Sequence, residues 1–212
     1  MSLGCFRVIT IAREYGSGGA AVAAALAERL QFELLDRKLI EKIAEAGRIA
    51  PELAERFDEH VDRWLDRIGR ALRFGSFEAV SGVAESDLVD AKRLAVISGQ
   101  IITEAAAVGR CVIVGRGAQC LLTGRADVFH AFVYASPDER LRNLRIKLGA
   151  GTPAEAAIAA VDQERAAYVR EHFGRDWLDP HLYHLMVNTD LGRAAAVEAI
   201  FAALEKGVGG FA

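Results

Sequence analysis

Five short apolar runs recur along the chain, and each is followed by a polar turn and then by a segment with helical periodicity. The runs are 6–12, 32–35, 111–114, 129–134 and 185–188. β-Branched residues dominate the first run, and the third is apolar throughout, as in parallel strands covered on both faces. Strands that alternate with helices pair in parallel through right-handed crossovers. The pattern therefore predicts a three-layer α/β/α fold with a five-stranded parallel sheet, in which the strand around Ile9 is central.

Helical periodicity and capping residues predict the segments between the strands. The periodic segments are 20–30, 38–46, 87–108 and 193–206. Ser136-Pro137-Asp138-Glu139 has the N-cap, proline and glutamate of a helix start, and the same signature at Thr152 predicts a helix to about residue 170. A long apolar stripe over 53–72 must pack either on the core of this domain or on a partner subunit. Both alternatives stay open, and a homodimer is one of them.

The turn after the first strand is rich in glycine and leads directly into the first helix. N–H groups of such a turn and of the helix start converge on one point, where the helix dipole also favours an anion. The candidate phosphate-binding residues are Tyr15, Gly16, Ser17, Gly18, Gly19, Ala20 and Ala21. In the complete P-loop, G-x-x-x-x-G-K-[ST], a lysine and a hydroxyl follow the last glycine. Here Arg13 stands at the first glycine, Gly19 at the lysine and Ala20 at the hydroxyl, so a turn that binds nothing is the alternative.

Arginines occur in the turns after three of the predicted strands. The turns are 13–19, 36–37 and 115–117, and they contain Arg13, Arg37 and Arg116. Ligands of parallel α/β sheets bind outside the carboxyl ends of the strands. We therefore expect the three turns to form one site.

Length, charge and cysteine content narrow the class of protein. The 212 residues are enough for one domain with a sizeable core, and a net charge of −3 gives no basic field for a nucleic-acid polymer. No window of about 18 residues is apolar throughout, so no membrane span is expected. The first residues have no signal-peptide pattern and the three cysteines stand in apolar contexts, which favours reduced thiols and a cytoplasmic location.

Four stretches, in order along the chain, resemble the cytidylate-kinase-like branch of the nucleoside monophosphate kinases. The first, 9–19, is similar to the opening of that branch, which also lacks the usual lysine. The second, 35–40, is similar to its second-strand ending. The third, 112–118, corresponds to the turn whose arginine holds the monophosphate in ordinary cytidylate kinases. The fourth resembles the lid and the last strand, and consists of 162–168 with Trp177, Asp179, Pro180, Tyr183, Asn188 and Thr189.

The resemblance implies a P-loop kinase-like fold in a single domain over 1–212, with a helical monophosphate-binding insertion at 37–108 and a helical lid at 149–180. It implies a nucleoside monophosphate kinase that transfers the γ-phosphate of ATP to a pyrimidine monophosphate, with CMP as the expected acceptor. ATP and Mg²⁺ are the expected cofactors, and small-molecule nucleotides are the expected partners. The alternative is a binding module that keeps the kinase fold and holds a nucleotide without turnover.

Phosphoryl transfer needs positive charge around the moving group, and the resemblance suggests which arginines supply it. Arg13, Arg116 and Arg165 are expected to be catalytic, with Arg13 in place of the missing lysine. The residues expected at the monophosphate are Asp36, Arg37, Arg116, Arg140 and Arg170. Asp36 has the alternative role of a helix cap, and no side chain is assigned to a metal.

Some positions depart from the family pattern. Ile158 and Val161 stand where lid arginines are usual, Tyr183 replaces an acidic residue that reads the cytosine, and within its branch Ala20 replaces a frequent arginine. Trp177 and Tyr183 are interpreted either as base-stacking residues or as buried anchors of the lid loop. Three histidines are expected to be solvated rather than to bind metal: His172, His181 and His184.

Overall fold

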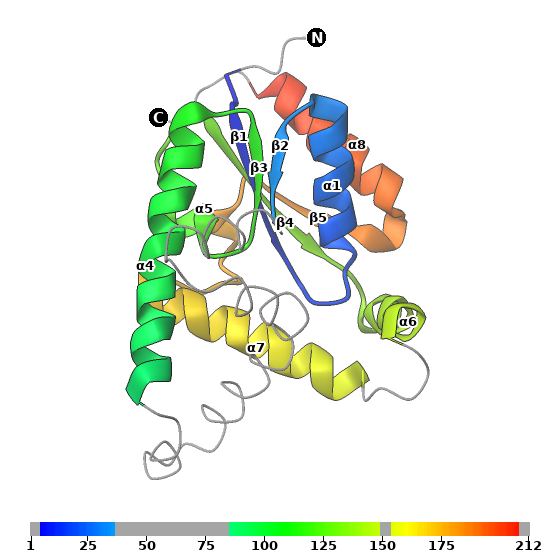
Figure 1. Cartoon of the computed structure of the whole chain (residues 1–212). Helices are drawn as coiled ribbons and strands as arrows, with labels where there is room; N and C mark the ends of the chain where they lie inside the picture. Colours follow the sequence, from blue (N-terminus) through cyan, green and yellow to red (C-terminus); the bar gives the residue numbers. More distant parts are fainter. Residues whose placement is uncertain (1–4, 37–84, 149–153, 208–212) are drawn as a thin grey trace.

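The computed structural model describes residues 5–36, 85–148 and 154–207, and a five-stranded parallel sheet forms its centre (Figure 1). The strands are β1 (Val8–Arg13), β2 (Glu33–Leu35), β3 (Cys111–Val114), β4 (Val128–Tyr134) and β5 (Leu185–Asn188). Their order across the sheet is β2-β3-β1-β4-β5, and each neighbouring pair is parallel. The five predicted strands and the central place of β1 are thereby confirmed.

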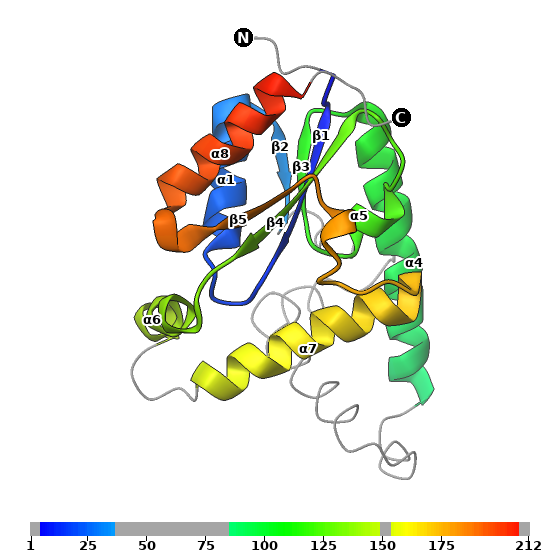
Figure 2. The ribbon, with the colours of Figure 1, turned by 180° about the vertical axis from the view of Figure 1, so that it is seen from behind.

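Helices cover both faces of the sheet, which gives the predicted three layers (Figures 1 and 2). Helices α1 (Gly19–Leu30) and α8 (Arg193–Lys206) pack on one face. Helices α4 (Glu85–Val108) and α5 (Ala118–Leu121) pack on the other. Two further helices, α6 (Pro137–Leu148) and α7 (Ala154–Phe173), lie at the edge where the strands end, followed by short 3₁₀ turns at η2 (Pro180–Leu182) and η3 (Thr189–Leu191).

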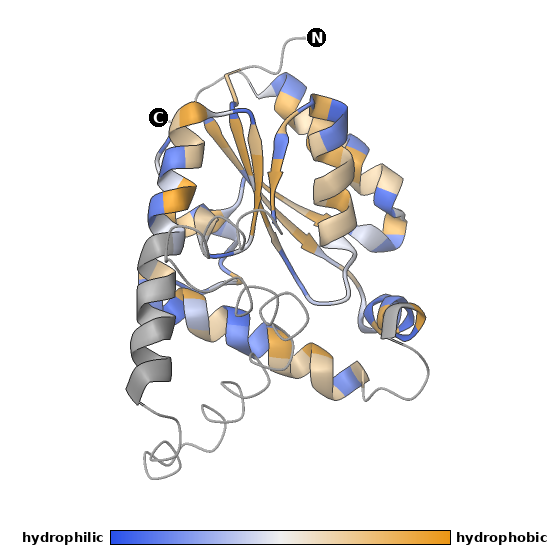
Figure 3. Ribbon diagram, viewed as in Figure 1, coloured by the Kyte–Doolittle hydropathy of each residue, from blue (hydrophilic) through white to orange (hydrophobic). Residues whose placement is uncertain are grey.

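Alternate residues of β1 point to the two layers and explain the burial of this strand on both sides. Ile9 and Ile11 pack beneath α1 and α8, whereas Val8 packs with Ile102 of α4 and Ala118 of α5. The strands form the most continuous hydrophobic part of the molecule in Figure 3. A sheet covered in this way leaves its carboxyl edge as the place where polar turns can gather.

Strand register brings the ends of neighbouring strands together at that edge. Ile11 of β1 lies opposite Val114 of β3, and Leu35 of β2 lies opposite Ile113. The turns after β1, β2 and β3 therefore leave the sheet on one side. In Figure 1 this edge faces α7, which lies across it.

The capping signature at Ser136 forms as predicted: its Oγ accepts the Glu139 N–H at 3.4 Å, and α6 begins at Pro137. Helix α7 continues past its predicted end near residue 170 to Phe173, and Gly174 follows with a left-handed φ of +63°. The helix predicted over 38–46 and the apolar stripe over 53–72 lie outside the described residues. None of the described helices combines the length and apolarity that a bilayer span requires.

Candidate functional site

The turns after β1, β2 and β3 meet around one cavity of about 800 Å³ at the carboxyl edge of the sheet. Helices α6 and α7 and the first residue of α8 complete its wall. The charged and polar residues of the wall include Arg13, Glu14, Asp36, Arg116, Gln119, Asn143, Glu164, Arg165, Tyr168 and Arg193. The three turns were expected to form one site, and residues of all three line this cavity, with Asp36 representing the turn after β2. Arg37 lies outside the described residues.

The loop between β1 and α1 presents N–H groups to the cavity. Gly16 and Gly18 adopt left-handed φ values of +84° and +76°. Within the part of the chain that the structure describes, the N–H groups of Gly16, Gly18 and Ala20 have no hydrogen-bond acceptor. An array of such donors at a helix N-terminus is a ready site for a phosphate group.

Ser17 shapes this loop from inside. Its buried Oγ donates to the carbonyl oxygen of Glu14 at 2.9 Å and accepts the Gly19 N–H at 3.3 Å. Its own carbonyl oxygen accepts the Thr189 hydroxyl at 2.7 Å. The Ser17 side chain therefore holds the turn together, and the loop offers main-chain groups to a ligand.

Arg13 explains why glycine stands at the lysine position. A Cβ at Gly19 would lie 2.6 Å from the Cβ of Arg13, and a Cβ at Gly115 would lie 2.2 Å from Arg13 Nη1. The Arg13 side chain thus runs from the start of α1 to the turn after β3, along the cavity wall. Burial lowers its pKa, the nearby Asp36 carboxylate opposes that shift, and Arg116 adds to it.

Arg116 is held in a strained turn after β3, in the wall of the cavity. Gly115, Arg116 and Gly117 have φ values of +76°, +57° and +68°, and a left-handed arginine is an unusual conformation that structures retain mainly at functional sites. A Cβ at Gly117 would lie 2.2 Å from the ring of Phe173, so the end of α7 fits only against glycine. Burial lowers the pKa of Arg116, whereas Tyr168 and Asp36 favour its charged form.

Arg165 reaches from α7 to the loop. Its Nη1 donates to the carbonyl oxygen of Arg13 at 2.6 Å, and its guanidinium carbon lies 5.7 Å from the centre of the Tyr15 ring. Burial, with the neighbouring Arg13 charge, lowers its pKa to about 9, so the side chain stays protonated at neutral pH. Arg13, Arg116 and Arg165 all line the cavity.

Arg140 and Arg170 are placed differently from the sequence-based expectation that both contact the monophosphate. Arg140 is 8% exposed and lies behind the loop, where its Nε donates to the carbonyl oxygen of Tyr15 at 2.7 Å and its guanidinium pairs with Asp162. Arg170 is exposed on α7. Neither lines the cavity among the described residues.

Two residues of the cavity wall, Arg193 and Asn143, were not predicted from the sequence. Arg193 lies against Gly18, where a Cβ would be 3.1 Å from its Nε, and its Nη2 donates to Asn143 Oδ1 at 3.0 Å. Asn143 in turn donates from Nδ2 to the carbonyl oxygen of Gly16 at 3.0 Å. Arg193 begins the helix after β5, so the same strand-end rule could have found it. Asn143 lies within α6, where the sequence alone does not show which way a side chain points.

The structure also shows the surroundings of Trp177, Tyr183 and His184. Tyr183 donates its hydroxyl to the carbonyl oxygen of Trp177 at 2.7 Å, and Trp177 packs edge-on against Phe132 with ring centres 5.3 Å apart. Both are buried, as an anchor of the loop would be, although Trp177 also reaches the cavity wall. His184 is exposed, and its ring Nδ1 accepts the backbone N–H of His130 at 2.9 Å. The described residues contain no group of three or more His, Cys, Asp or Glu side chains suited to a metal.

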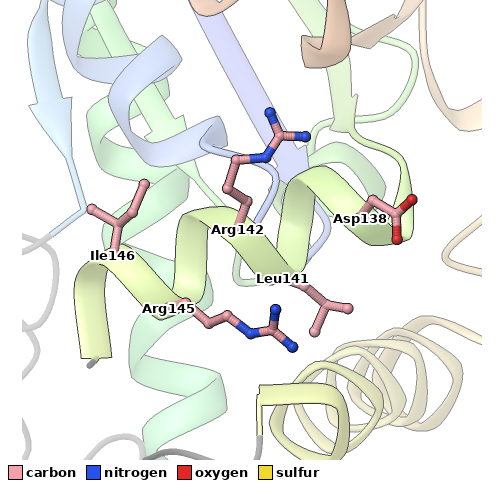
Figure 4. Close-up of a pocket in the computed structure, with 5 residues that line it drawn as sticks. All are labelled: Asp138, Leu141, Arg142, Arg145 and Ile146. Atoms are coloured by element: carbon pink, nitrogen blue, oxygen red, sulfur yellow. The ribbon is translucent and has the colours of Figure 1, made fainter. Parts of the chain in front are cut away.

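A second hollow lies on α6 and is lined by Asp138, Leu141, Arg142, Arg145 and Ile146 (Figure 4). Arg142 pairs with Glu139 at 3.0 Å and Arg145 with Glu155 at 3.4 Å. In Figure 4 the side chains of Arg142 and Arg145 point to opposite sides of the helix. No convergent set of polar groups results, so we place the functional site in the larger cavity.

Comparison with known proteins bears on the identity of this cavity. Residues 8–191 match the model of the cytidylate kinase-like family. An uncharacterized protein from Eubacterium ventriosum is similar over 94% of this chain and 98% of its own, with 20% identity and a TM-score of 0.66. No curated protein sequence matches the chain.

Two shikimate kinases share the fold. The enzyme from Bacteroides thetaiotaomicron has 18% identity and a TM-score of 0.53, over 93% of this chain and 98% of its own. The enzyme from Acinetobacter baumannii, solved in complex with shikimate, has 15% identity and a TM-score of 0.51, over 94% and 92%. Likeness at these identities shows the P-loop kinase-like fold, while the family match covers nearly the whole chain. The chain therefore belongs to the cytidylate kinase-like family.

Proposed function

We propose that this chain is a nucleoside monophosphate kinase that transfers the γ-phosphoryl group of ATP to a pyrimidine monophosphate, with CMP as the expected acceptor. One observation carries the proposal. The Arg13 side chain begins against Gly19, at the start of α1, and ends against Gly115, next to Arg116. A cation there lies between a cradle of N–H groups and a second arginine, where a transferred phosphoryl group needs positive charge.

The loop before α1 is the donor end in this proposal. The N–H groups of Gly16, Gly18 and Ala20 bind phosphate oxygens of ATP, and the dipole of α1 adds to their field. Arg13 supplies the charge that a lysine supplies in the complete P-loop. Arg193 adds a further cation beside Gly18.

The turn after β3 is the acceptor end. A guanidinium binds two oxygens of a monophosphate in a fixed fork, which is the role we assign to Arg116. Asp36 lies near enough to favour the charged form of both Arg13 and Arg116. Tyr168 and Trp177 add aromatic surface of the kind that holds a base.

In the proposed step, an oxygen of the acceptor phosphate attacks the γ-phosphorus of ATP while the bond to the β,γ-bridging oxygen breaks. ADP leaves with that oxygen. Arg13, Arg116 and Arg165 offset the charge of the moving group, and catalysis of this kind depends on position and charge. Magnesium is commonly held by one or two carboxylates with phosphates and waters, a donor set that Asp36 and Glu164 of the wall fit. When bound, it neutralises charge on the β- and γ-phosphates.

A nucleotide-binding module without turnover is the second candidate function. Two observations favour it: Ala20 has no hydroxyl to offer, and Nη1 of Arg165 is already bonded to the Arg13 carbonyl oxygen. Both candidates use the same cavity and bind the same nucleotides. Acceptor-dependent turnover separates them.

A coupled assay of ADP release from Mg²⁺-ATP, run across nucleoside monophosphates, tests the proposal. We expect ADP release that depends on a pyrimidine monophosphate, and a loss of about 10²–10³-fold in kcat for Arg13→Ala, as when one transition-state donor is removed. Glu155→Gln is the matched control, because Glu155 is an exposed carboxylate outside the cavity wall. Nucleotide binding without acceptor-dependent ADP release would instead support the binding module.

A further inference from the structure

Asp162 of α7 lies where several contacts converge on the phosphate loop. Its Oδ1 accepts the N–H of Tyr15 at 2.8 Å, and its Oδ2 pairs with Nη2 of Arg140. Arg165, one turn further along α7, approaches Oδ1 with its Nη1 at 3.6 Å. The Asp162 side chain is 17% exposed, so these contacts are partly shielded from water.

Arg140 completes the hold on Tyr15. Its Nε donates to the Tyr15 carbonyl oxygen at 2.7 Å, so both main-chain polar groups of Tyr15 are fixed, one by Asp162 and the other by the arginine that Asp162 pairs with. Glu14 provides a second carboxylate, with Oε2 at 3.4 Å from Arg140 Nη1. That oxygen also accepts the Ala135 N–H at 3.2 Å.

The peptide planes on both sides of Tyr15 are thereby set immediately before Gly16, where the chain turns left-handed. The directions of the N–H groups further along the loop depend on that turn. We propose that Asp162 is a positioning residue, which through Tyr15 and Arg140 holds the phosphate loop in its anion-binding conformation before a nucleotide arrives. The inference rests on the proposed function only for its effect on ATP.

An exposed ion pair between α7 and α6 shows the contrast. Glu155 and Arg145 are 67% and 60% exposed, with Oε1 and Nη2 3.4 Å apart, and such surface pairs contribute little to stability. Loss of the Asp162 carboxylate would instead leave the Tyr15 N–H without its acceptor and the buried Arg140 without its nearest counter-charge. Groups left unsatisfied in this way weaken the structure locally.

Amide hydrogen exchange of the ligand-free protein, followed by NMR, tests this role in Asp162→Ala and Asp162→Asn, with Glu155→Gln as control. We expect exchange of the Tyr15 N–H to accelerate about tenfold or more in Asp162→Ala, with Ile9 and Val112 of the central strands unchanged. Asp162→Asn should lie between, because its amide oxygen can still accept the N–H. By titration calorimetry, ATP should bind Asp162→Ala about tenfold more weakly, and CMP as in the parent.

Two outcomes would overturn the inference: parental exchange at Tyr15, or equal acceleration at Tyr15, Ile9 and Val112, which would make Asp162 a residue of general stability. If Asp162→Ala does not fold, the same comparison in Asp162→Asn decides. Should the parent bind no nucleotide, the proposed function fails, whereas exchange at Tyr15 still decides the role of Asp162.

Discussion

Arg13 and Gly19 form a coupled pair in which each side chain decides what the other position can hold. The complete P-loop pattern has glycine at the position of Arg13 and lysine at the position of Gly19. In this chain the arginine replaces that glycine, and a glycine replaces the lysine. A Cβ at Gly19 would lie 2.6 Å from the Cβ of Arg13, closer than non-bonded carbons approach. The positively charged side chain is therefore at position 13 in this chain and at position 19 in the complete P-loop pattern. Because the two positions are in contact, only one of them can hold a long side chain.

Gly19→Lys is expected to weaken ATP binding by about tenfold or more although it restores the motif residue, because the new side chain would displace Arg13. The double change Arg13→Gly/Gly19→Lys removes the contact and should bind ATP more tightly than Arg13→Gly alone. Titration calorimetry measures the affinities, and thermal unfolding of each variant checks that it folds. A gain in ATP affinity from Gly19→Lys alone would contradict the coupling.

Residues that follow strands were easier to place from the sequence than residues on helices, although Arg165 of α7 does line the cavity. Arg13, Asp36 and Arg116 come directly after apolar runs, so strand topology places them at one edge. Arg140 and Arg170 lie on helices, where a solvated arginine and a buried one look the same in sequence. Only the fold shows that Arg140 turns toward the back of the loop while Arg170 turns to solvent.

At the scale of elements, strands and capped helices were readable because each has a strong local signal. The continuous apolar run of β3 and the capping residues before α6 are such signals, and both formed as predicted. The contacts of α7 were not readable, because they depend on partners far away in the chain. Val169 packs with Trp177 near the sheet, and Arg165 reaches back to Arg13.

The lid predicted over 149–180 contains α7, and its opening is a prediction for hydrogen exchange. We expect α7 to exchange faster than β1 and β3, because much of its hold on the loop is ionic rather than apolar. Saturating ATP should slow exchange in α7 and leave the two strands unchanged. Equal protection of α7, β1 and β3 without nucleotide would count against a lid.

At the scale of the whole molecule, a buried histidine links stability to pH. His130 of β4 is 6% exposed, its Nδ1 lies 2.7 Å from the Thr10 hydroxyl oxygen, and the His184 ring stacks on it at 5.2 Å. Burial, with the charge of His184 as a smaller cause, lowers the pKa of His130 to about 4. Between that value and the ordinary histidine pKa of about 6.5, the unfolded chain binds more protons than the folded one.

His130 should therefore contribute no loss of stability above about pH 6.5 and an increasing loss as the pH falls toward 4. The expected loss is about 2 kcal/mol in the free energy of unfolding between pH 7 and pH 5. Urea denaturation at both values measures it, with His130→Gln as the comparison, since glutamine keeps a polar partner for Thr10 and does not titrate. An equal loss in parent and variant would exclude His130 as the cause.

The central claim is that one cavity has a donor end at Arg13 and an acceptor end at Arg116, and cross-titration of single variants tests it most directly. By calorimetry, Arg116→Ala should bind CMP at least about tenfold more weakly than the parent and ATP unchanged, and Arg116→Lys should lose nearly as much because an ammonium lacks the fork. Arg13→Ala should do the reverse, with ATP weakened and CMP unchanged. If Arg116→Ala binds CMP with parental affinity, the turn after β3 is not the acceptor site and the account is contradicted.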